Sequence, residues 1–190
     1  MSDIGIYPGA FDPVHRGHIA FARAAAQEVG LDRVVFLPEA YPRRKTGVTH
    51  IEHRIELLRR VLAGDANIGV DTAHGDRFST EETLPKLQDK YPGRLWFLLG
   101  SDVAKRLGRW DNIDVLCRSV GFIVGLRQSD TREDLQPALA DVYMYSPRIV
   151  FVESPERFVS SSLIRSGDEH IDLGSDVASY IREHNLYREG

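Results

Sequence analysis

The sequence contains one cysteine, Cys117, and lacks any apolar run of transmembrane length. One cysteine excludes an intramolecular disulfide framework, which indicates a reducing compartment such as the cytoplasm. Residues Met1–Ile4 lack the basic and apolar regions of a signal peptide. A membrane-crossing helix would need about 20 apolar residues in succession. We therefore expect a soluble cytoplasmic protein with no membrane partner.

Basic residues are also too few to outweigh the acidic ones. The 24 Lys and Arg residues face 28 Asp and Glu residues, which gives a formal net charge of -4. This balance removes any general electrostatic attraction to nucleic acid, and no basic stripe is present. Affinity for phosphate must therefore come from a local site. The length of 190 residues favours a single domain, 1–190, with a substantial core, and a homo-oligomer is compatible with it.

Short apolar runs alternate with segments of helical pattern along the chain. The runs contain little polar alternation, which indicates strands buried on both faces. The helical segments between them favour parallel strands, because parallel neighbours need a crossover connection. We therefore predict an α/β fold with a doubly wound parallel sheet and helices on both faces. The predicted strands are Ile4–Tyr7, Arg33–Leu37, Ile68–Asp71, Leu95–Leu99, Gly121–Leu126 and Arg148–Val152.

Capping signals mark several helix ends. The first predicted helix, His18–Val29, ends at Gly30, a residue suited to the left-handed C-cap conformation. Thr49–Glu52 and Ser79–Glu82 have the spacing of a capping box and predict two helix starts. The polar stretch Gln128–Gln136 is typical of a loop or a helix start. Two further helices are predicted over Ser160–Ser166 and Ser175–His184.

The most distinctive segment is Gly-Ala-Phe-Asp-Pro-Val-His-Arg-Gly-His, residues 9–18. It joins a predicted strand to a helix N-terminus, where free N–H groups and the helix dipole favour phosphate. Gly9 and Gly17 allow a tight turn or a close approach to a ligand. His15 and His18 lie one helical turn apart and can project to the same side. The residues leave open a donor cluster for phosphate, a helix-capping pair, and a two-histidine metal site, which no cysteine cluster completes.

This segment resembles the signature of the nucleotidylyltransferase superfamily, G-x-F-D-P-x-H-x-G-H. Its members join a nucleoside triphosphate to a phosphate-bearing acceptor, on a Rossmann-like fold. The resemblance implies ATP as one substrate, with Mg²⁺ held mainly by the ATP phosphates and no metal ligands from the protein. It implies catalytic roles for His15 and His18, and nucleotide contacts from Gly9, Ala10, Phe11 and Gly17.

Three later segments also resemble the superfamily. Tyr41–Lys45 is similar to a lysine-bearing loop, which implies that Lys45 contacts phosphate and leaves the role of Arg44 open. The loop from Gly100 to Asp102 matches a Gly-x-Asp loop beside the ATP ribose and adenine. Val159–Arg165 is similar to the second signature, I-S-S-T-x-I-R. A solvated basic loop and ordinary helix caps are the structural alternatives. The contacts implied by the second signature are catalytic Arg165 and the nucleotide-binding Ser160, Ser161 and Ser162.

The segment around Trp110 resembles nicotinate-mononucleotide adenylyltransferases, in which a tryptophan lies near the pyridine ring. The C-terminal stretch 177–187 is similar to the end of the same branch. This resemblance implies transfer of AMP from ATP to nicotinate mononucleotide, with Thr80, Thr83 and Trp110 contacting the acceptor. It implies no covalent nucleophile. Cys117 is expected to be buried and to take no part in the reaction.

One stretch departs from that branch. Where a Tyr commonly precedes the Thr, this chain has Phe78-Ser79-Thr80, and Glu81 and Glu82 follow. The two acids suit a helix N-terminus but sit awkwardly beside an anionic ring substituent. The acceptor therefore stays open between nicotinate mononucleotide, nicotinamide mononucleotide and phosphopantetheine. A non-catalytic nucleotide-binding regulator is the alternative of another class.

Overall fold

A parallel six-stranded sheet forms the centre of the computed structural model. The structure describes residues 1–43, 46–72, 76–127, 130–145, 147–153, 160–166 and 174–187. The strands are β1 (Asp3–Gly9), β2 (Arg33–Pro38), β3 (Ile68–Val70), β4 (Arg94–Gly100), β5 (Gly121–Leu126) and β6 (Arg148–Glu153). Every neighbouring pair is parallel, so the predicted parallel sheet is confirmed.

The strand order is β3-β2-β1-β4-β5-β6. The chain moves outward from β1 through β2 to β3, and then crosses back to build β4, β5 and β6 on the other side of β1. This is the doubly wound Rossmann-like order, and it is the fold class that the sequence predicts. The two directions of winding part at the carboxyl ends of β1 and β4, which is where such sheets form a crevice.

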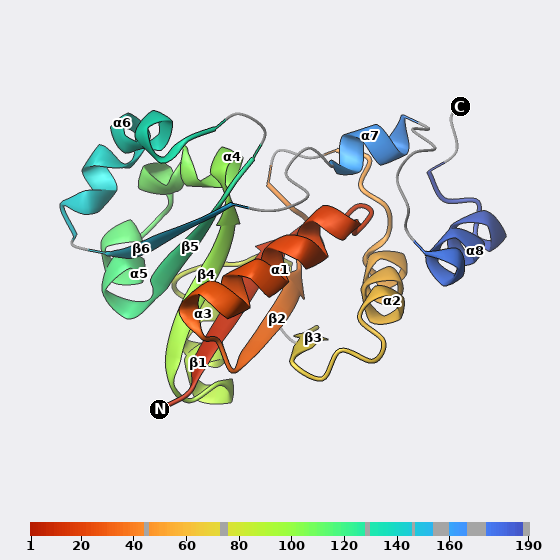
Figure 1. Ribbon diagram of the computed structural model, residues 1–190, viewed down its shortest axis with the longest axis horizontal. Coiled ribbons are helices and arrows are strands. Elements are labelled where there is room, and N and C mark those ends of the chain that lie inside the picture. Colours follow the sequence, from red (N-terminus) through yellow and green to blue (C-terminus); the bar gives the residue numbers. More distant parts are fainter. Residues whose placement is uncertain are drawn as a thin grey trace.

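Helices cover both faces of the sheet (Figure 1). One face packs against α1 (Arg16–Val29), α2 (Ile51–Val61) and α8 (Ser175–Glu183). The other packs against α3 (Thr83–Lys90), α4 (Ser101–Ala104), η1 (Leu107–Arg109), α5 (Ile113–Ser119) and α6 (Arg132–Tyr143). The short α7 (Ser161–Arg165) lies between β6 and α8 in the sequence. No described helix has the length and hydropathy to cross a bilayer.

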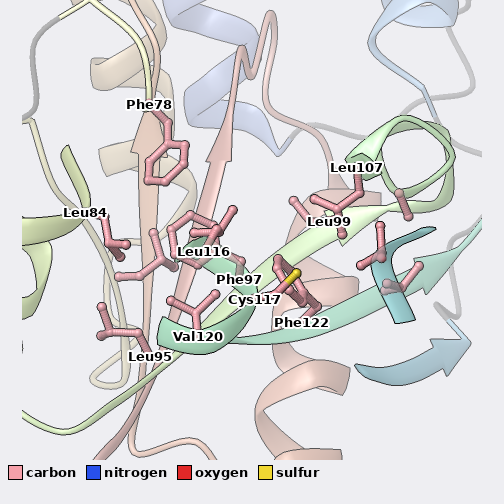
Figure 2. Close-up of a cluster of buried hydrophobic side chains, with 14 of the residues drawn as sticks. Phe78, Leu84, Leu95, Phe97, Leu99, Leu107, Leu116, Cys117, Val120 and Phe122 are labelled. Carbon is pink, nitrogen blue, oxygen red and sulfur yellow. The ribbon is translucent and has the colours of Figure 1, made fainter. Parts of the chain in front are cut away.

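Strand β4 illustrates why the strands read as continuous apolar runs. Leu95, Phe97 and Leu99 enter the cluster beneath α3 to α6, which Figure 2 shows. The alternate residues Trp96 and Leu98 enter the cluster beneath α1, α2 and α8. Because side chains alternate between the two faces of a strand and both faces are covered, every position must be apolar.

The capping box expected at Thr49–Glu52 is wrong. Helix α2 begins at Ile51, and His50 is its N-cap residue. The Thr49 carbonyl instead accepts a hydrogen bond from Arg54 Nε at 2.7 Å, and the Thr49 N–H donates to Asp12 Oδ1 at 3.3 Å. Contacts with the rest of the molecule therefore hold Thr49 outside the helix.

The helix start expected at Ser79 is wrong, because it lies one turn before the observed start of α3. Ser79 Oγ accepts a hydrogen bond from the Glu82 N–H at 2.9 Å, but α3 begins at Thr83. Ser79 therefore stabilises the turn that precedes the helix. The C-cap expected at Gly30 is confirmed, with φ +72°. In the polar stretch after β5, Thr131 forms a capping box with Asp134 and opens α6.

Candidate active site

A cavity of about 330 Å³ lies at the crevice between the carboxyl ends of β1 and β4. The end of β1 and the loop into α1 form one wall, and the ends of β4 and β5 form another. Several of the residues predicted to act in catalysis, bind the nucleotide or contact the acceptor meet here. Those that line the cavity are Gly9, Ala10, Phe11, His15, Gly17, His18, Gly100, Trp110 and Ser161.

The two predicted catalytic histidines stack on each other at the start of α1. Their ring centroids are 3.6 Å apart, and their planes differ by 28°. His15 is the N-cap residue of α1 and is 1% exposed, whereas His18 is partly buried. The structure therefore brings the pair together on one side of the helix, as the spacing predicts.

A backbone hydrogen bond sets the tautomer of His18. The His15 N–H donates to His18 Nδ1 at 3.2 Å. A nitrogen that accepts from an N–H cannot carry a proton, so the neutral His18 ring has its proton on Nε2. Because the His18 ring lines the cavity, this tautomer gives the site a donor suited to phosphate oxygens.

Phe11 shapes the loop that follows β1. Its φ is +49°, a left-handed conformation in a residue that is 2% exposed. Its ring packs 5.2 Å from that of Tyr7 and 5.0 Å from that of His18. A Cβ on Gly9 would lie 3.0 Å from the Phe11 ring. A side chain at position 9 would crowd the Phe11 ring by a few tenths of an ångström, so Gly9 makes room for Phe11 in addition to allowing the ligand approach that the sequence suggests.

The second signature packs against the first. Ser161 Oγ donates to the Pro13 carbonyl at 3.0 Å, and Arg165 Nη1 donates to the Asp12 carbonyl at 2.5 Å. Arg165 Nη2 also reaches Ser162 Oγ at 3.4 Å. Ser161 lines the cavity, whereas Ser160, Ser162 and Arg165 do not line it in this conformation. Their phosphate contacts therefore stay predictions.

The cavity is basic although the whole chain is acidic. Four of its described lining residues are arginines: Arg43, Arg106, Arg109 and Arg127. They come from the loop after β2, from the segment around η1 and from the end of β5. This local concentration of positive charge suits phosphate groups, to which the overall charge of -4 gives no general attraction.

Glu39 is the acidic residue in the described lining. Its Oε1 accepts a hydrogen bond from the Phe78 N–H at 2.9 Å. Burial raises the pKa of Glu39, while the Phe78 N–H and the charges of Arg43, Arg77 and Arg54 oppose that rise. The Glu39 carboxylate therefore links the loop after β2 to the segment before α3 through this hydrogen bond. The nearby arginines favour its charged form.

The loop after β4 holds the predicted nucleotide contacts Gly100 and Asp102. Gly100 lines the cavity, and a Cβ there would lie 3.3 Å from Arg127 Cδ. Asp102 accepts a hydrogen bond from Arg127 Nη1 at 3.0 Å and is outside the lining. Asp102 thus orients an arginine of the cavity, and its predicted contact with the nucleotide stays a prediction.

A smaller cavity of about 180 Å³ adjoins the first and shares Arg43, Phe78 and Trp110 with it. Thr80 also lines it and donates to the Asp111 carbonyl at 3.2 Å. Its other lining residues are Ser79, Glu81, Asp111 and Asn112. The predicted acceptor-binding residues Thr80 and Trp110 therefore lie together, on the side of the site away from the signature loop.

Thr83 and Lys45 complete the predicted site residues. Thr83 is 2% exposed, and its Oγ1 accepts from the Ser79 N–H at 3.1 Å. It therefore supports the wall of the smaller cavity from behind. Lys45, like Arg44, lies outside the described residues. Arg43, two residues earlier, provides the cation that the structure describes in this loop.

Arg54 supports the site from outside the cavity lining, and sequence reasoning missed it. It is fully buried on α2, and its guanidinium contacts the loops that follow β1 and β2. A signal was available, because Ile51, Arg54, Ile55 and Leu58 share one helical face. An arginine on the apolar face of a helix needs buried acceptors for its N–H groups.

Comparison with known proteins identifies the class that this fold and site define. The chain belongs to the Cytidylyltransferase-like family, whose model matches residues 6–167. It is 33% identical over 198 residues to the probable nicotinate-nucleotide adenylyltransferase of Neisseria meningitidis serogroup C, with 100% of both chains covered. The Bacillus licheniformis relative of the same name is 30% identical, with 98% of this chain and 99% of the relative covered. The chain is therefore a nucleotidyltransferase enzyme of the nicotinate-nucleotide adenylyltransferase group.

Solved structures agree on the fold. The nicotinic acid mononucleotide adenylyltransferase of Plasmodium falciparum complexed with NaAD has a TM-score of 0.78 and 20% sequence identity, and 98% of each chain is covered. A putative nicotinate-nucleotide adenylyltransferase from Vibrio parahaemolyticus has a TM-score of 0.61 at 16% identity, with 100% of this chain and 98% of that chain covered. At these identities the likeness supports the fold class.

Proposed function

We propose that the protein transfers AMP from ATP to nicotinate mononucleotide, forming nicotinate adenine dinucleotide and pyrophosphate. The observation that carries this proposal is a basic cavity at the switch point, with the stacked histidine pair on one side and Trp110 on the other. The full-length relatives named for this reaction support the choice of acceptor.

The reaction needs alignment and charge stabilisation more than proton transfer. The acceptor phosphate is anionic at neutral pH, so its oxygen attacks the α-phosphorus of ATP without a general base. The bond from the α-phosphorus to the bridging oxygen breaks, and pyrophosphate leaves with that electron pair. Fixed donors around the α-phosphate and the departing pyrophosphate lower the barrier for such a step.

The described residues match this requirement. His18 offers its Nε2–H to the α-phosphate, and the stacked His15 holds the His18 ring in place. The N-terminus of α1 supplies further N–H donors beside the same loop, which Ser161 holds through its hydrogen bond to the Pro13 carbonyl. We assign the predicted roles of Lys45 and Arg165 to the β- and γ-phosphates, where cations offset the developing charge.

Mg²⁺ fits this site as an ion carried in by ATP. Among the residues that the structure describes, no group of three or more His, Cys, Asp or Glu is arranged to hold a metal ion. Glu39 is the acidic residue of the described cavity lining. Mg²⁺ commonly binds through substrate phosphates with few protein ligands, and when bound it offsets the negative charge of the triphosphate.

On the acceptor side, Trp110 gives the pyridine ring an aromatic surface, and Thr80 lies beside it in the smaller cavity. The two acids that depart from the nicotinate pattern differ in position: Glu81 lines the smaller cavity, and Glu82 does not. Glu81 Oε1 accepts a hydrogen bond from Asn112 Nδ2 at 2.9 Å, which occupies part of its carboxylate. Glu82 donates its N–H to Ser79 and does not line the smaller cavity. Arg43, whose Nη2 lies 3.8 Å from Asp111 Oδ2, supplies the positive charge in the described lining of the smaller cavity that would face an anionic ring substituent.

The test is pyrophosphate release by the purified protein with ATP and Mg²⁺. Nicotinate mononucleotide, nicotinamide mononucleotide and phosphopantetheine are compared as acceptors, and the dinucleotide product is identified by mass spectrometry. We expect a strong preference for nicotinate mononucleotide. Preference for one of the other two would reassign the acceptor, and ATP binding without turnover on any of them would contradict the enzymatic proposal.

We also propose that the reaction takes place in the cytoplasm. Cys117 is a free, buried thiol, which fits a reducing compartment. A homo-oligomer remains a prediction, and size-exclusion chromatography with light scattering measures it directly.

A further inference from the structure

The carbonyl groups at the crevice need partners because the pairing of β1 and β2 ends there. The ladder between the strands ends at the pair Gly9 and Pro38, and the Glu39 N–H makes a last bond to the Gly9 carbonyl at 3.0 Å. Beyond this point the strand ladder does not continue, and both loops contribute residues to the cavity lining. Ala10 lies on one loop, and Glu39 and Ala40 lie on the other.

Arg54 fills the space between the two loops. Its Nη1 donates to the Ala10 carbonyl at 2.6 Å and to the Glu39 carbonyl at 2.9 Å. Its Nη2 donates to the Ala40 carbonyl at 3.1 Å, and its Nε donates to the Thr49 carbonyl at 2.7 Å. One planar group thus joins three segments: the signature loop, the loop after β2 and the approach to α2.

The chemistry of this contact requires a guanidinium. Arginine presents five N–H donors in a fixed plane, whereas lysine presents three donors on a single nitrogen. Burial lowers the pKa of Arg54, while Asp12, Tyr187 and Glu39 raise it. The side chain remains charged in spite of burial, since an arginine is effectively always protonated in a protein.

We propose that Arg54 is a positioning residue for the reaction: by hydrogen bonding the carbonyls of Ala10, Glu39 and Ala40, it fixes the distance between the signature loop and the loop after β2. The first loop leads to the histidines at the start of α1, and the second leads to Arg43 and the predicted phosphate contact Lys45. Arg54 does not line the cavity, so it acts through the residues it holds. The inference rests on the proposed adenylyl transfer.

The test replaces Arg54 with Lys, which keeps the charge and cannot reach all four carbonyls. A misplacement of about 1 Å costs roughly a hundredfold in rate, so we expect kcat/KM for ATP to fall about a hundredfold, with a KM at least about tenfold higher. Arg59→Lys is the matched control, because Arg59 is exposed on the same helix. It should stay within about twofold of the wild type.

If Arg54 only stabilised the fold, its replacement would change the maximal rate and not KM. Loss of folded protein lowers the maximal rate but leaves KM unchanged, because KM does not depend on the concentration of active enzyme. Leu57→Ala, at a fully buried position of α2, provides that comparison. If Arg54→Lys lowers the rate with an unchanged KM, as expected of Leu57→Ala, the positioning role is wrong. If Arg54→Lys does not fold, Arg54→Gln is measured in the same way at lower temperature.

The two proposals can fail separately. A wild-type protein that releases no pyrophosphate with any acceptor overturns the proposed function. The positioning role is then measured by calorimetry with Mg-ATP, where Arg54→Lys should bind about tenfold more weakly than both the wild type and Arg59→Lys. Equal affinity of all three proteins would overturn the positioning role itself.

Discussion

The two sides of the cavity differ in how firmly the rest of the protein holds them. On the signature side, Phe11, Asp12, Val14 and His15 are at most 3% exposed. On the acceptor side, Glu81 and Asn112 are exposed, and the side chain of Asp111 is 89% exposed. The predicted phosphate site thus lies on a packed frame, whereas the predicted acceptor site combines the buried Thr80 with exposed loop residues.

Distant segments converge on the signature loop through Asp12. Its Oδ1 accepts hydrogen bonds from the Thr49 N–H at 3.3 Å and from the Tyr187 hydroxyl at 2.8 Å, and its carbonyl accepts from Arg165. The partners come from the approach to α2, from α7 and from the C-terminal segment. Reaction geometry must be kept within fractions of an ångström, which explains why the packed side carries the histidines.

The largest effect is expected from removing the donor on the packed side. His18→Asn keeps an oxygen that can accept from the His15 N–H but has no donor at the position of Nε2. We expect kcat to fall about a hundredfold to a thousandfold, as when one transition-state donor is lost. Steady-state kinetics measures the effect, and the thermal midpoint should stay near that of the wild type. A loss of less than about tenfold would contradict the assigned role.

The next largest effect is expected from Trp110, on the acceptor side of the cavity. Trp110→Ala should raise the KM for the mononucleotide about tenfold to a hundredfold, because stacking of a base on an aromatic side chain contributes about 1–3 kcal/mol. The KM for ATP should change by less than about twofold. Trp110→Phe keeps an aromatic surface and is the control. Equal changes in both KM values would show that Trp110 supports the fold rather than the acceptor.

A smaller effect tests the anchoring of the signature loop. Tyr187→Phe removes the hydroxyl that donates to Asp12, so the free energy of unfolding should fall by about 1–2 kcal/mol in urea denaturation. Burial raises the pKa of Tyr187, so its hydroxyl remains a donor throughout the neutral range and the loss should not vary with pH between 6 and 9. Tyr41→Phe, at a residue 69% exposed, should cost nothing measurable. The prediction fails if both variants unfold alike.

The smallest effect is expected at Cys117, in the core away from both sides. Burial raises the pKa of this thiol to about 11, and the charge of Asp114 adds to the rise. At pH 8 roughly one thiol in a thousand is then ionised, so alkylation by iodoacetamide should be far slower than for free cysteine. Cys117→Ala should leave kcat within about twofold of the wild type. Rapid alkylation that abolishes activity would place the thiol near the chemistry.

Much of the fold follows from local sequence patterns. The six apolar runs are strands within one or two residues, because burial on both faces leaves no room for polar side chains in a run such as Leu95–Leu99. The capping box at Thr49 failed because a hydrogen bond to Asp12, 37 residues earlier in the sequence, competes with the helix for this backbone. Such a partner cannot be read from spacing along the chain.

The strand–loop–helix at residues 9–18 and the placement of its histidines follow from local sequence, because both depend on spacing over a single helical turn. Which charges meet at the cavity depends on the tertiary structure. Arg43, the neighbours Arg106 and Arg109, and Arg127 come from three separate parts of the chain and converge through the order of the strands. The tertiary structure also decided that Arg54 lies inside, since the carbonyls that bind this arginine become neighbours when β1 and β2 pair.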